Sequence, residues 1–269
     1  MSNDYPERIV CLTEETTETL YLLGEDWRIV GISGYTVRPP QARHEKPKVS
    51  AFTTARIEEI VRLEPDLVLG FSDLQGDIAR DLVKRGIEVH IFNQRTLTGI
   101  FRMIRVLGAM IGCQEKAVRL VAELQSGLAD VRAKSELLHA RPRVYFEEWD
   151  APQISGIGWV SELIHLAGGQ DCFEELGCEP LATNRIIADP REVVRRRPEI
   201  IVGSWCGKKF RAETIAARDG WQEVPAVKNG HLYEIKSPII LQPGPAAVTD
   251  GVNELLRIFT NWDQLHRSS

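Results

Sequence analysis

The polar and apolar positions of this chain repeat one composite pattern twice. RIEEIVRLEPDLVLG (Arg56 to Gly70) and DPREVVRRRPEIIVG (Asp189 to Gly203) align without a gap, and their prolines are 133 residues apart. In each copy an amphipathic stretch stops at the proline, and an acidic residue then leads into a short apolar, β-branched run that ends in glycine. Because proline disfavours helical backbone just before it, each copy predicts a helix followed by a buried strand.

Further strands are predicted in both halves of the chain. RIVCLTEET from Arg8 and RVYFEEWD from Arg143 are apolar runs that continue into acidic residues, where we expect a helix to begin. GIEVHIF (Gly86 to Phe92) and GHLYEI (Gly230 to Ile235) each follow a helical stretch. Strands that alternate with helices indicate βαβ units with right-handed crossovers and parallel sheets. The sequence therefore predicts an α/β protein with two Rossmann-like lobes.

Two amphipathic helices are predicted between the lobes. Apolar residues recur three or four positions apart on both sides of Gly112, first at Leu97, Ile100, Ile104, Leu107 and Ile111, and then at Ala117, Leu120, Val121, Leu124, Leu128 and Val131. This spacing is typical of a helix with one buried face. The second helix should extend to about Leu138 and carry the chain between the lobes as a single long helix. We thus expect an N-terminal lobe at 1–96, connecting helices at 97–140 and a C-terminal lobe at 141–269.

Composition and charge exclude several functional classes. The 269 residues are 43% hydrophobic and 26% charged, which is ordinary for a soluble globular protein. The net charge of −5, from 33 basic and 38 acidic residues, argues against a nucleic-acid partner. No apolar run is long enough for direct membrane insertion. The N-terminal MSNDYPERIVCLTEE has no basic segment followed by an apolar one, so we expect a cytoplasmic protein, or a periplasmic one if a leader was removed.

The sequence also lacks the common motifs of metal sites and α/β enzymes. The six histidines show no HxxxH, HxH or HExxH spacing, and the five cysteines include no CxxC pair. No phosphate-binding Gly-Lys loop, GxSxG elbow or dinucleotide fingerprint occurs. We therefore expect no metal site, no intrinsic cofactor and no catalytic residues.

Three stretches carry a resemblance to a known family: GISGYTVRPPQ (Gly31 to Gln41), VSAFTTARIEEIVRLEPDLVLG (Val49 to Gly70) and SGIGWVSELIHLAGG (Ser155 to Gly169). Together with the two-lobed layout, the chain resembles the helical-backbone (class III, TroA/BtuF-like) substrate-binding proteins of ABC importers, and within them the cobalamin-binding branch. The resemblance implies a ligand cleft between the lobes, at loops after the carboxyl ends of the strands. Iron-siderophore, haem and metal-ion binding proteins share this architecture and remain alternatives.

The ligand implied by the resemblance is a corrinoid, a large flat molecule with apolar faces and amide groups on its rim. By position in the family pattern, Tyr35 and Phe52 would form aromatic walls in the first lobe, although cobalamin binders usually carry tryptophan at the place of Phe52. The second lobe would supply Trp149, Trp159 and Trp205, which we expect after strands or at helix starts. The alternative for each tryptophan is a place in the core.

Acidic residues follow the first strand of each half. They are Glu14 and Glu15 in the first lobe, and Glu147, Glu148 and Asp150 in the second. In the first turn of a helix such carboxylates complement the helix dipole. The functional alternatives are that Glu147 and Asp150 accept hydrogen bonds from corrin amides, offset the charge of a cobalt centre, or bind a hard cation.

Cys206 and Gln242 complete the candidate ligand-binding residues. Cys206 lies in SWCGKK beside Lys208 and Lys209, where a thiol could have a lowered pKa and react, ligate a soft metal axially, or be an incidental loop residue. Gln242 opens QPGPAAVTDGVNELLRIF, a segment that the resemblance places beside the cleft, where this side chain could donate to the ligand.

The resemblance also implies how such a protein docks on its transporter. In importing relatives an exposed glutamate on each lobe, seven residues before the proline that precedes the buried strand, pairs with arginine on the membrane permease. Glu58 holds this position in the first lobe, whereas Arg191 holds it in the second. Because arginine opposite arginine repels, this departure argues against a standard importer partner. We expect a small-molecule ligand, and an ABC permease that docks on the first lobe only stays open as a further partner.

Two functional classes remain open at this stage. The first is a non-catalytic protein that binds a corrinoid for uptake or intracellular carriage. The second is a cytoplasmic enzyme that reuses the fold, with Cys206 and the acidic residues Glu147, Glu148 and Asp150 as its chemistry. The two differ in whether these groups converge at hydrogen-bond distance or line a broad cavity with the aromatic residues. We favour binding, because no general base with an orienting partner is recognisable.

Overall fold

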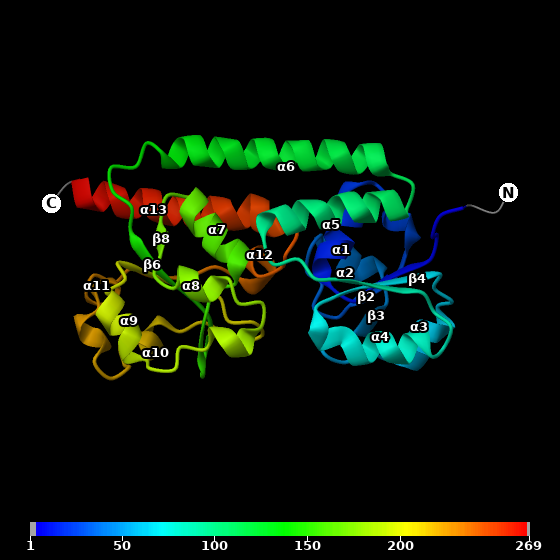
Figure 1. Ribbon diagram of the computed structural model, residues 1–269, viewed down its shortest axis with the longest axis horizontal. Helices are drawn as coiled ribbons and strands as arrows, with labels where there is room; N and C mark the ends of the chain where they lie inside the picture. Colours follow the sequence, from blue (N-terminus) through cyan, green and yellow to red (C-terminus); the bar gives the residue numbers. More distant parts are fainter. Residues whose placement is uncertain (1–3, 268–269) are drawn as a thin grey trace. The chain divides into compact units, whose positions relative to one another are not determined.

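The computed structural model describes residues 4–267 of the chain, which form two compact units (Figure 1). The N-terminal unit contains the chain up to Gln94, then Thr98–Leu124 and Gln242–Ala246. The C-terminal unit contains Arg95–Leu97, Gln125–Leu241 and the chain from Ala247 onward. No helix among the described residues has the length and apolar character needed to cross a membrane.

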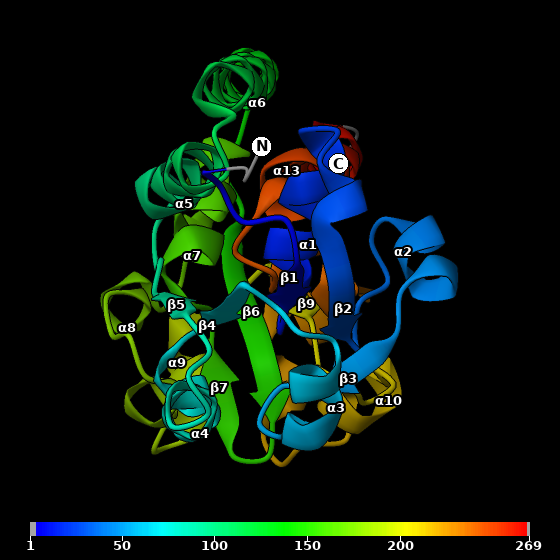
Figure 2. The same ribbon diagram turned by 90° about the vertical axis from the view of Figure 1, so that its right-hand side faces the viewer.

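The N-terminal unit is built on a five-stranded parallel sheet, as expected. Its strands lie in the order β3-β2-β1-β4-β5, which is a doubly wound arrangement with its switch point between β1 and β4. Figure 2 shows these strands with the helices of the unit around them. The strands are β1 (Ile9–Cys11), β2 (Ile29–Ser33), β3 (Lys48–Ser50), β4 (Leu67–Phe71) and β5 (Val89–Phe92).

Helices follow these strands in the alternation that the sequence predicts. Helix α1 packs on β1 and β2, α3 on β3, and α4 on β5. The core between them consists of fully buried aliphatic side chains, among them Val10, Leu12 and Val68. The helices are α1 (Glu14–Leu22), η1 (Asp26–Arg28), α2 (Pro40–Glu45), α3 (Ile57–Arg62), η2 (Asp73–Gln75), α4 (Gly76–Val83) and α5 (Leu97–Met110). Helix α6 (Gln114–Ser135) belongs to the N-terminal unit up to Leu124 and to the C-terminal unit from Gln125.

The sheet of the C-terminal unit is mixed, which corrects the expectation of a parallel sheet in both lobes. Its order is β10-β9-β6-β7, with β8 also paired to β6, and β7 runs antiparallel to β6. The reason is local: β6 continues through Asp150, and the chain turns at once so that Gln153 pairs with Asp150. The strands are β6 (Arg143–Asp150), β7 (Gln153–Ser155), β8 (Gln170–Asp171), β9 (Ile200–Gly203) and β10 (Leu232–Glu234).

Helices and a large aromatic core complete the C-terminal unit. The core cluster includes the buried rings of Tyr145, Phe173, Trp205 and Trp221. The predicted repeat is confirmed, because α3 and β4 in one unit correspond to α9 and β9 in the other. The helices are α7 (Gly158–Leu166), α8 (Glu174–Gly177), η3 (Ala182–Arg185), α9 (Arg191–Arg196), α10 (Ala212–Ala216), η4 (Trp221–Glu223), α11 (Pro225–Lys228), α12 (Ser237–Ile240), the π-helical η5 (Ala247–Gly251) and α13 (Val252–Arg267).

One segment of the C-terminal half packs within the N-terminal unit. Pro243 accepts a hydrogen bond from Gln94 Nε2 at 2.9 Å, and the Ala246 N–H donates to Glu18 Oε2 at 3.0 Å. Gly244 approaches α1 so closely that a Cβ atom there would lie 2.5 Å from the Cβ atom of Glu15. Glycine at this position therefore permits the segment Gln242–Ala246 to lie against α1.

Candidate functional site

Glu147 is the centre of a buried polar network at the end of β6. Its side chain is fully buried, and its two oxygens accept four hydrogen bonds. Oε1 accepts from Trp205 Nε1 at 3.1 Å and from Arg218 Nη2 at 2.9 Å, and Oε2 accepts from Tyr145 OH at 2.9 Å and from Arg218 Nη1 at 2.5 Å. The network joins β6, the loop after β9 and the turn before η4 into one rigid wall.

The charges in this network shift the proton affinities of its members. Burial, together with the negative charge of Glu147, raises the pKa of Tyr145 well above its ordinary value. Burial alone would lower the pKa of Arg218, but its hydrogen bonds to Glu147 raise it above its ordinary value. Arg218 thus stays charged, and Glu147 neutralises that charge inside the wall.

A layer of aromatic rings and one lysine lies next to this network. The Trp205 ring is buried against Phe210, with ring centroids 5.1 Å apart. Lys208 Nζ lies 5.3 Å from the ring of Trp205 and 5.8 Å from the ring of Trp149, and it forms an ion pair with Asp150 Oδ2. At these distances the ammonium group is attracted to the faces of both rings, which fixes the loop after β9.

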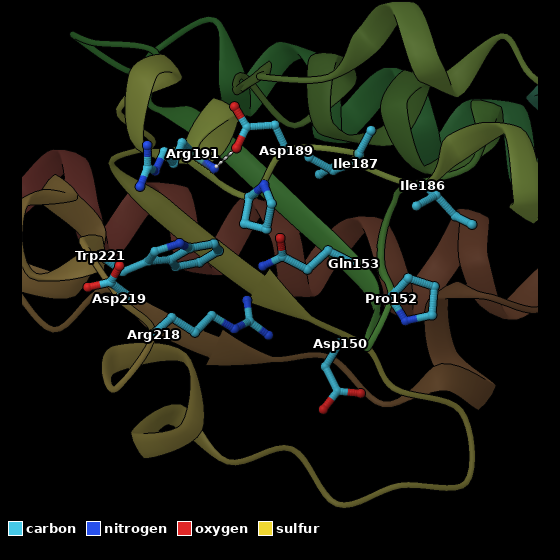
Figure 3. A pocket seen from close by; sticks show the side chains of 12 residues that line it. Asp150, Pro152, Gln153, Ile186, Ile187, Asp189, Arg191, Arg218, Asp219 and Trp221 are labelled. Atoms are coloured by element: carbon cyan, nitrogen blue, oxygen red, sulfur yellow. Dashed lines mark hydrogen bonds between the residues drawn. The ribbon is translucent and has the colours of Figure 1, made fainter.

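A pocket of about 640 Å³ opens in the C-terminal unit beside this wall (Figure 3). Apolar and polar residues contribute equally to its lining, and five of the polar ones carry charged side chains. The polar groups include Gln153 Oε1 and Asp150 Oδ1, which are buried and have no hydrogen-bond partner within residues 4–267. The lining residues are Asp150, Pro152, Gln153, Ile186, Ile187, Ala188, Asp189, Pro190, Arg191, Arg218, Asp219 and Trp221.

The N-terminal unit presents two aromatic side chains on loops at the carboxyl end of its sheet. Tyr35 follows β2 and is 54% exposed, and Phe52 follows β3 and is half-buried. The Tyr35 N–H donates to Ser33 Oγ at 3.2 Å, and the Phe52 carbonyl accepts from Gln75 Nε2 at 2.9 Å. The backbone of both loops is therefore fixed while the rings remain accessible.

Helix α1 carries three buried carboxyl groups at the same end of the sheet. Glu18 forms an ion pair with Arg38, whose Nε lies 3.0 Å from Glu18 Oε1. Burial raises the pKa of Glu14 to about 8 and that of Glu15 to about 7. Hydrogen bonds act in the opposite direction: the backbone of Val37 donates to Glu14, and the Thr13 hydroxyl donates to Glu15 at 2.6 Å. Within the described chain, no group of three or more His, Cys, Asp or Glu residues is arranged to hold a metal ion.

Comparison with known proteins assigns the chain to a family. Residues 9–239 match the family described as periplasmic binding protein. The chain belongs to this family. The expectation of a binding protein rather than an enzyme is thereby confirmed, since the relatives and structural neighbours of this periplasmic binding protein are solute-binding proteins.

Relatives cover almost the whole chain. An uncharacterized ABC transporter substrate-binding lipoprotein of Bacillus subtilis is 25% identical over 93% of this chain and 79% of its own length. A vitamin B12-binding protein of Vibrio parahaemolyticus is 24% identical over 99% of this chain and 93% of its own. The chain is thus similar along its length both to a transporter component and to a vitamin-binding protein.

Solved structures confirm the fold of the chain. The vitamin B12 binding protein BtuF of Vibrio cholerae superposes with a TM-score of 0.74 at 22% identity, covering 96% of this chain and 98% of that one. A possible iron-binding protein of Staphylococcus epidermidis has a TM-score of 0.81 at 20% identity, covering 95% and 99% of the two chains. At these identities the likeness establishes the architecture and leaves the ligand to be argued from the site.

Several sequence predictions about the site need correction. Glu147 and Trp149 lie inside strand β6, not in a loop or at a helix start. Because all four hydrogen bonds of Glu147 are made within the protein, it supports the wall and does not face a ligand. Trp159 is buried in α7 and donates to the Ile240 carbonyl at 2.9 Å, so it is a core residue. Trp205 is also buried, and its role is to hold Glu147.

The remaining predicted residues are spread over the two units. Cys206 is exposed in the loop after β9, and Gln242 is half-buried in the segment that packs with the N-terminal unit. Glu58 is exposed on α3, where its Oε1 lies 2.5 Å from Arg85 Nη2. Arg191, which sequence analysis assigned to the docking position, lines the pocket.

Gln153, Arg218 and Trp221 are among the pocket residues that sequence reasoning missed. Arg218 lies 71 residues from Glu147, so no local pattern links the two charges. Gln153 follows a proline in WDAPQIS, and that turn sequence is the one local signal that could have placed it at the start of a returning strand.

Proposed function

We propose that this periplasmic binding protein reversibly binds a corrinoid of the vitamin B12 type, without catalysing a reaction. The observation that carries the proposal is the combination of near full-length similarity to vitamin B12-binding proteins with a partly apolar pocket that contains hydrogen-bond acceptors without a partner among the described residues. The haem-binding proteins RhuT of Roseiflexus and IsdE of Staphylococcus aureus also share the fold, so the choice between ligands is argued from the chemistry of the pocket.

The pocket chemistry suits one edge of a corrinoid. Ile186, Ile187 and Trp221 provide apolar contact for the ring system, and Asp150 Oδ1 offers an acceptor for an N–H donor. Corrinoids carry primary amides around the ring, which are N–H donors, whereas haem carries carboxylates. A corrinoid is larger than 640 Å³, so we propose that only one edge enters the pocket.

Accessible aromatic rings in each unit are proposed to contact the apolar faces of the ligand. Trp149 in the C-terminal unit is half-buried beside Lys208, and Tyr35 and Phe52 in the N-terminal unit stand on anchored loops. A fixed ring loses little conformational entropy when a flat ligand stacks on it.

The test is a titration of the purified protein with aquo-, cyano- and adenosylcobalamin and with haem, followed by calorimetry and by the visible spectrum. We expect micromolar or tighter binding of a cobalamin, and a loss of affinity of about tenfold in Tyr35→Ala and in Trp149→Ala. Trp27→Ala is the matched control, because Trp27 is an exposed tryptophan at η1. Haem binding without cobalamin binding would refute the corrinoid assignment.

A cobalamin spectrum that changes on binding and reverts in Cys206→Ser would identify Cys206 as an axial ligand.

We further propose that the protein serves a membrane permease through its N-terminal unit. The supporting observations are the similarity to an ABC transporter substrate-binding lipoprotein and the exposure of Glu58. Pull-down of a reconstituted cobalamin permease should weaken with Glu58→Arg and strengthen with Arg191→Glu. Equal capture by both variants would refute docking through these positions.

A further inference from the structure

Gln153 is held rigidly at the start of β7, with its side chain inside the pocket. The backbone carbonyl of Gln153 accepts a hydrogen bond from the Ile187 N–H at 2.9 Å, and Gln153 pairs with Asp150 across the β6–β7 hairpin. The residue is only 7% exposed. Figure 3 shows its carboxamide extending from β7 toward Arg218 and Trp221.

The carboxamide oxygen of Gln153 has no donor among the residues that the structure describes. Arg218, a cationic donor that lines the same pocket, directs both Nη1 and Nη2 to Glu147, at 2.5 and 2.9 Å. Buried carbonyl oxygens in folded proteins almost always have a donor, because leaving one unpaired costs its full desolvation penalty. An acceptor kept in this state at the wall of a cavity is therefore available to a bound molecule.

We propose that Gln153 determines ligand specificity by accepting a hydrogen bond from an N–H group of the bound molecule. This inference rests on the proposed corrinoid function, and within it the donor is a primary amide on the corrin rim. The second buried acceptor in the pocket without a hydrogen-bond donor among the described residues is Asp150 Oδ1. Asp150 lies directly opposite Gln153 in the β6–β7 hairpin. A carboxylate in place of the amide has no N–H to donate and meets the negative charge of Asp150, so amides are selected over acids.

The substitution Gln153→Met tests the hydrogen bond while keeping the length of the side chain. Because Oε1 bonds to no other residue in the described chain, we expect the thermal unfolding temperature to stay the same. Affinity for cyanocobalamin, measured by calorimetry, should fall by roughly 5- to 100-fold. Gln170→Met is the matched control, since Gln170 is exposed on β8 of the same unit, and it should leave affinity unchanged.

The substitution Gln153→Glu separates accepting from donating. A carboxylate can only accept, so we expect Gln153→Glu to bind cyanocobalamin within about threefold of the unmodified protein. The same variant should bind a monocarboxylic acid derivative of cyanocobalamin at least about tenfold more weakly than cyanocobalamin itself, because two carboxylates would face each other. If Gln153→Glu loses as much affinity as Gln153→Met, then the NH2 group of Gln153 makes the contact and the proposal is wrong.

The outcomes distinguish this inference from the proposed function. Absence of cobalamin binding by the unmodified protein overturns both the corrinoid assignment and the donor named for Gln153. Binding by the unmodified protein with equal affinity in Gln153→Met overturns only the role of Gln153, and the proposed function stands.

Discussion

The buried carboxyl group of Glu15 makes the stability of the protein depend on pH in an unusual direction. Glu15 is fully buried in α1, its Oε1 accepts from the Thr13 hydroxyl at 2.6 Å, and its Oε2 has no partner within residues 4–267. Burial raises its pKa from 4.5 to about 7. A group whose pKa is higher in the folded state binds protons preferentially to that state, so its contribution favours folding at low pH and is lost as the pH rises.

The size of the effect follows from the pKa difference. A rise of about 2.5 pH units corresponds to roughly 3 kcal/mol of differential stability. This contribution is complete below the unfolded pKa of 4.5 and is lost progressively until the pH passes about 7. Glu14, with a pKa of about 8, changes stability in the same direction and extends the window upward.

Substitution of Glu15 by Gln isolates this contribution, because glutamine imitates the protonated acid in shape and charge. In urea unfolding at about pH 5, 7 and 9, we expect Glu15→Gln to match the unmodified protein at the lowest pH and to exceed its free energy of unfolding by roughly 2 to 3 kcal/mol at the highest. Glu123→Gln, at an exposed position of α6, is the control and should show no such trend. A difference between Glu15→Gln and the unmodified protein that is constant from pH 5 to 9 would refute the reasoning.

Three further predictions concern packing and the site. Glu147→Ala leaves the buried charge of Arg218 without its partner and should cost about 3 to 5 kcal/mol in urea unfolding, part of which Arg218→Met on the same background should restore. Gly244→Ala places a methyl group 2.5 Å from a side-chain carbon of α1, so it should lower the unfolding temperature and reduce the free energy of unfolding by about 1 to 3 kcal/mol. Gly127→Ala in α6 is the control, because its methyl group meets no neighbour within 4 Å and the substitution should be neutral or stabilising. Tyr35→Ala should weaken cobalamin binding in calorimetry without changing the unfolding temperature, because the ring is 54% exposed; an equal loss of stability would assign the ring to the core.

The repeated helix and strand could be predicted from sequence because each is defined by local spacing. Proline, the apolar run and the closing glycine all lie within 15 residues of one another, and the structure has α3 with β4 and α9 with β9 at these places. The place of Gln242–Ala246 in the N-terminal unit depends instead on contacts with Glu18 and Gln94, which are far away in the chain. No local pattern carries that information.

The wrong prediction for β6 has the same physical origin. Acidic residues after an apolar run usually indicate that a strand has ended and a helix is beginning, because a carboxylate is costly to bury. In β6 the strand continues through Glu147, since Arg218, Trp205 and Tyr145 donate to its carboxylate. These donors come from segments that the sequence separates widely, so the local pattern indicated a helix start.

The same distinction separates supporting residues from candidate ligand contacts in the pocket. Glu147 and Asp150 are three residues apart in one strand, and both are carboxylates. Both carboxylate oxygens of Glu147 accept hydrogen bonds from within the protein. In Asp150, Oδ2 forms an ion pair with Lys208, whereas Oδ1 has no partner among the described residues. Both are acidic residues of the same strand, and they differ in whether the protein supplies a donor to each carboxylate oxygen. Because a buried acceptor without a donor is unfavourable, a ligand that supplies the donor recovers free energy at Asp150 and Gln153. Substitutions at these two residues should therefore change which ligand is bound more than how stably the protein folds.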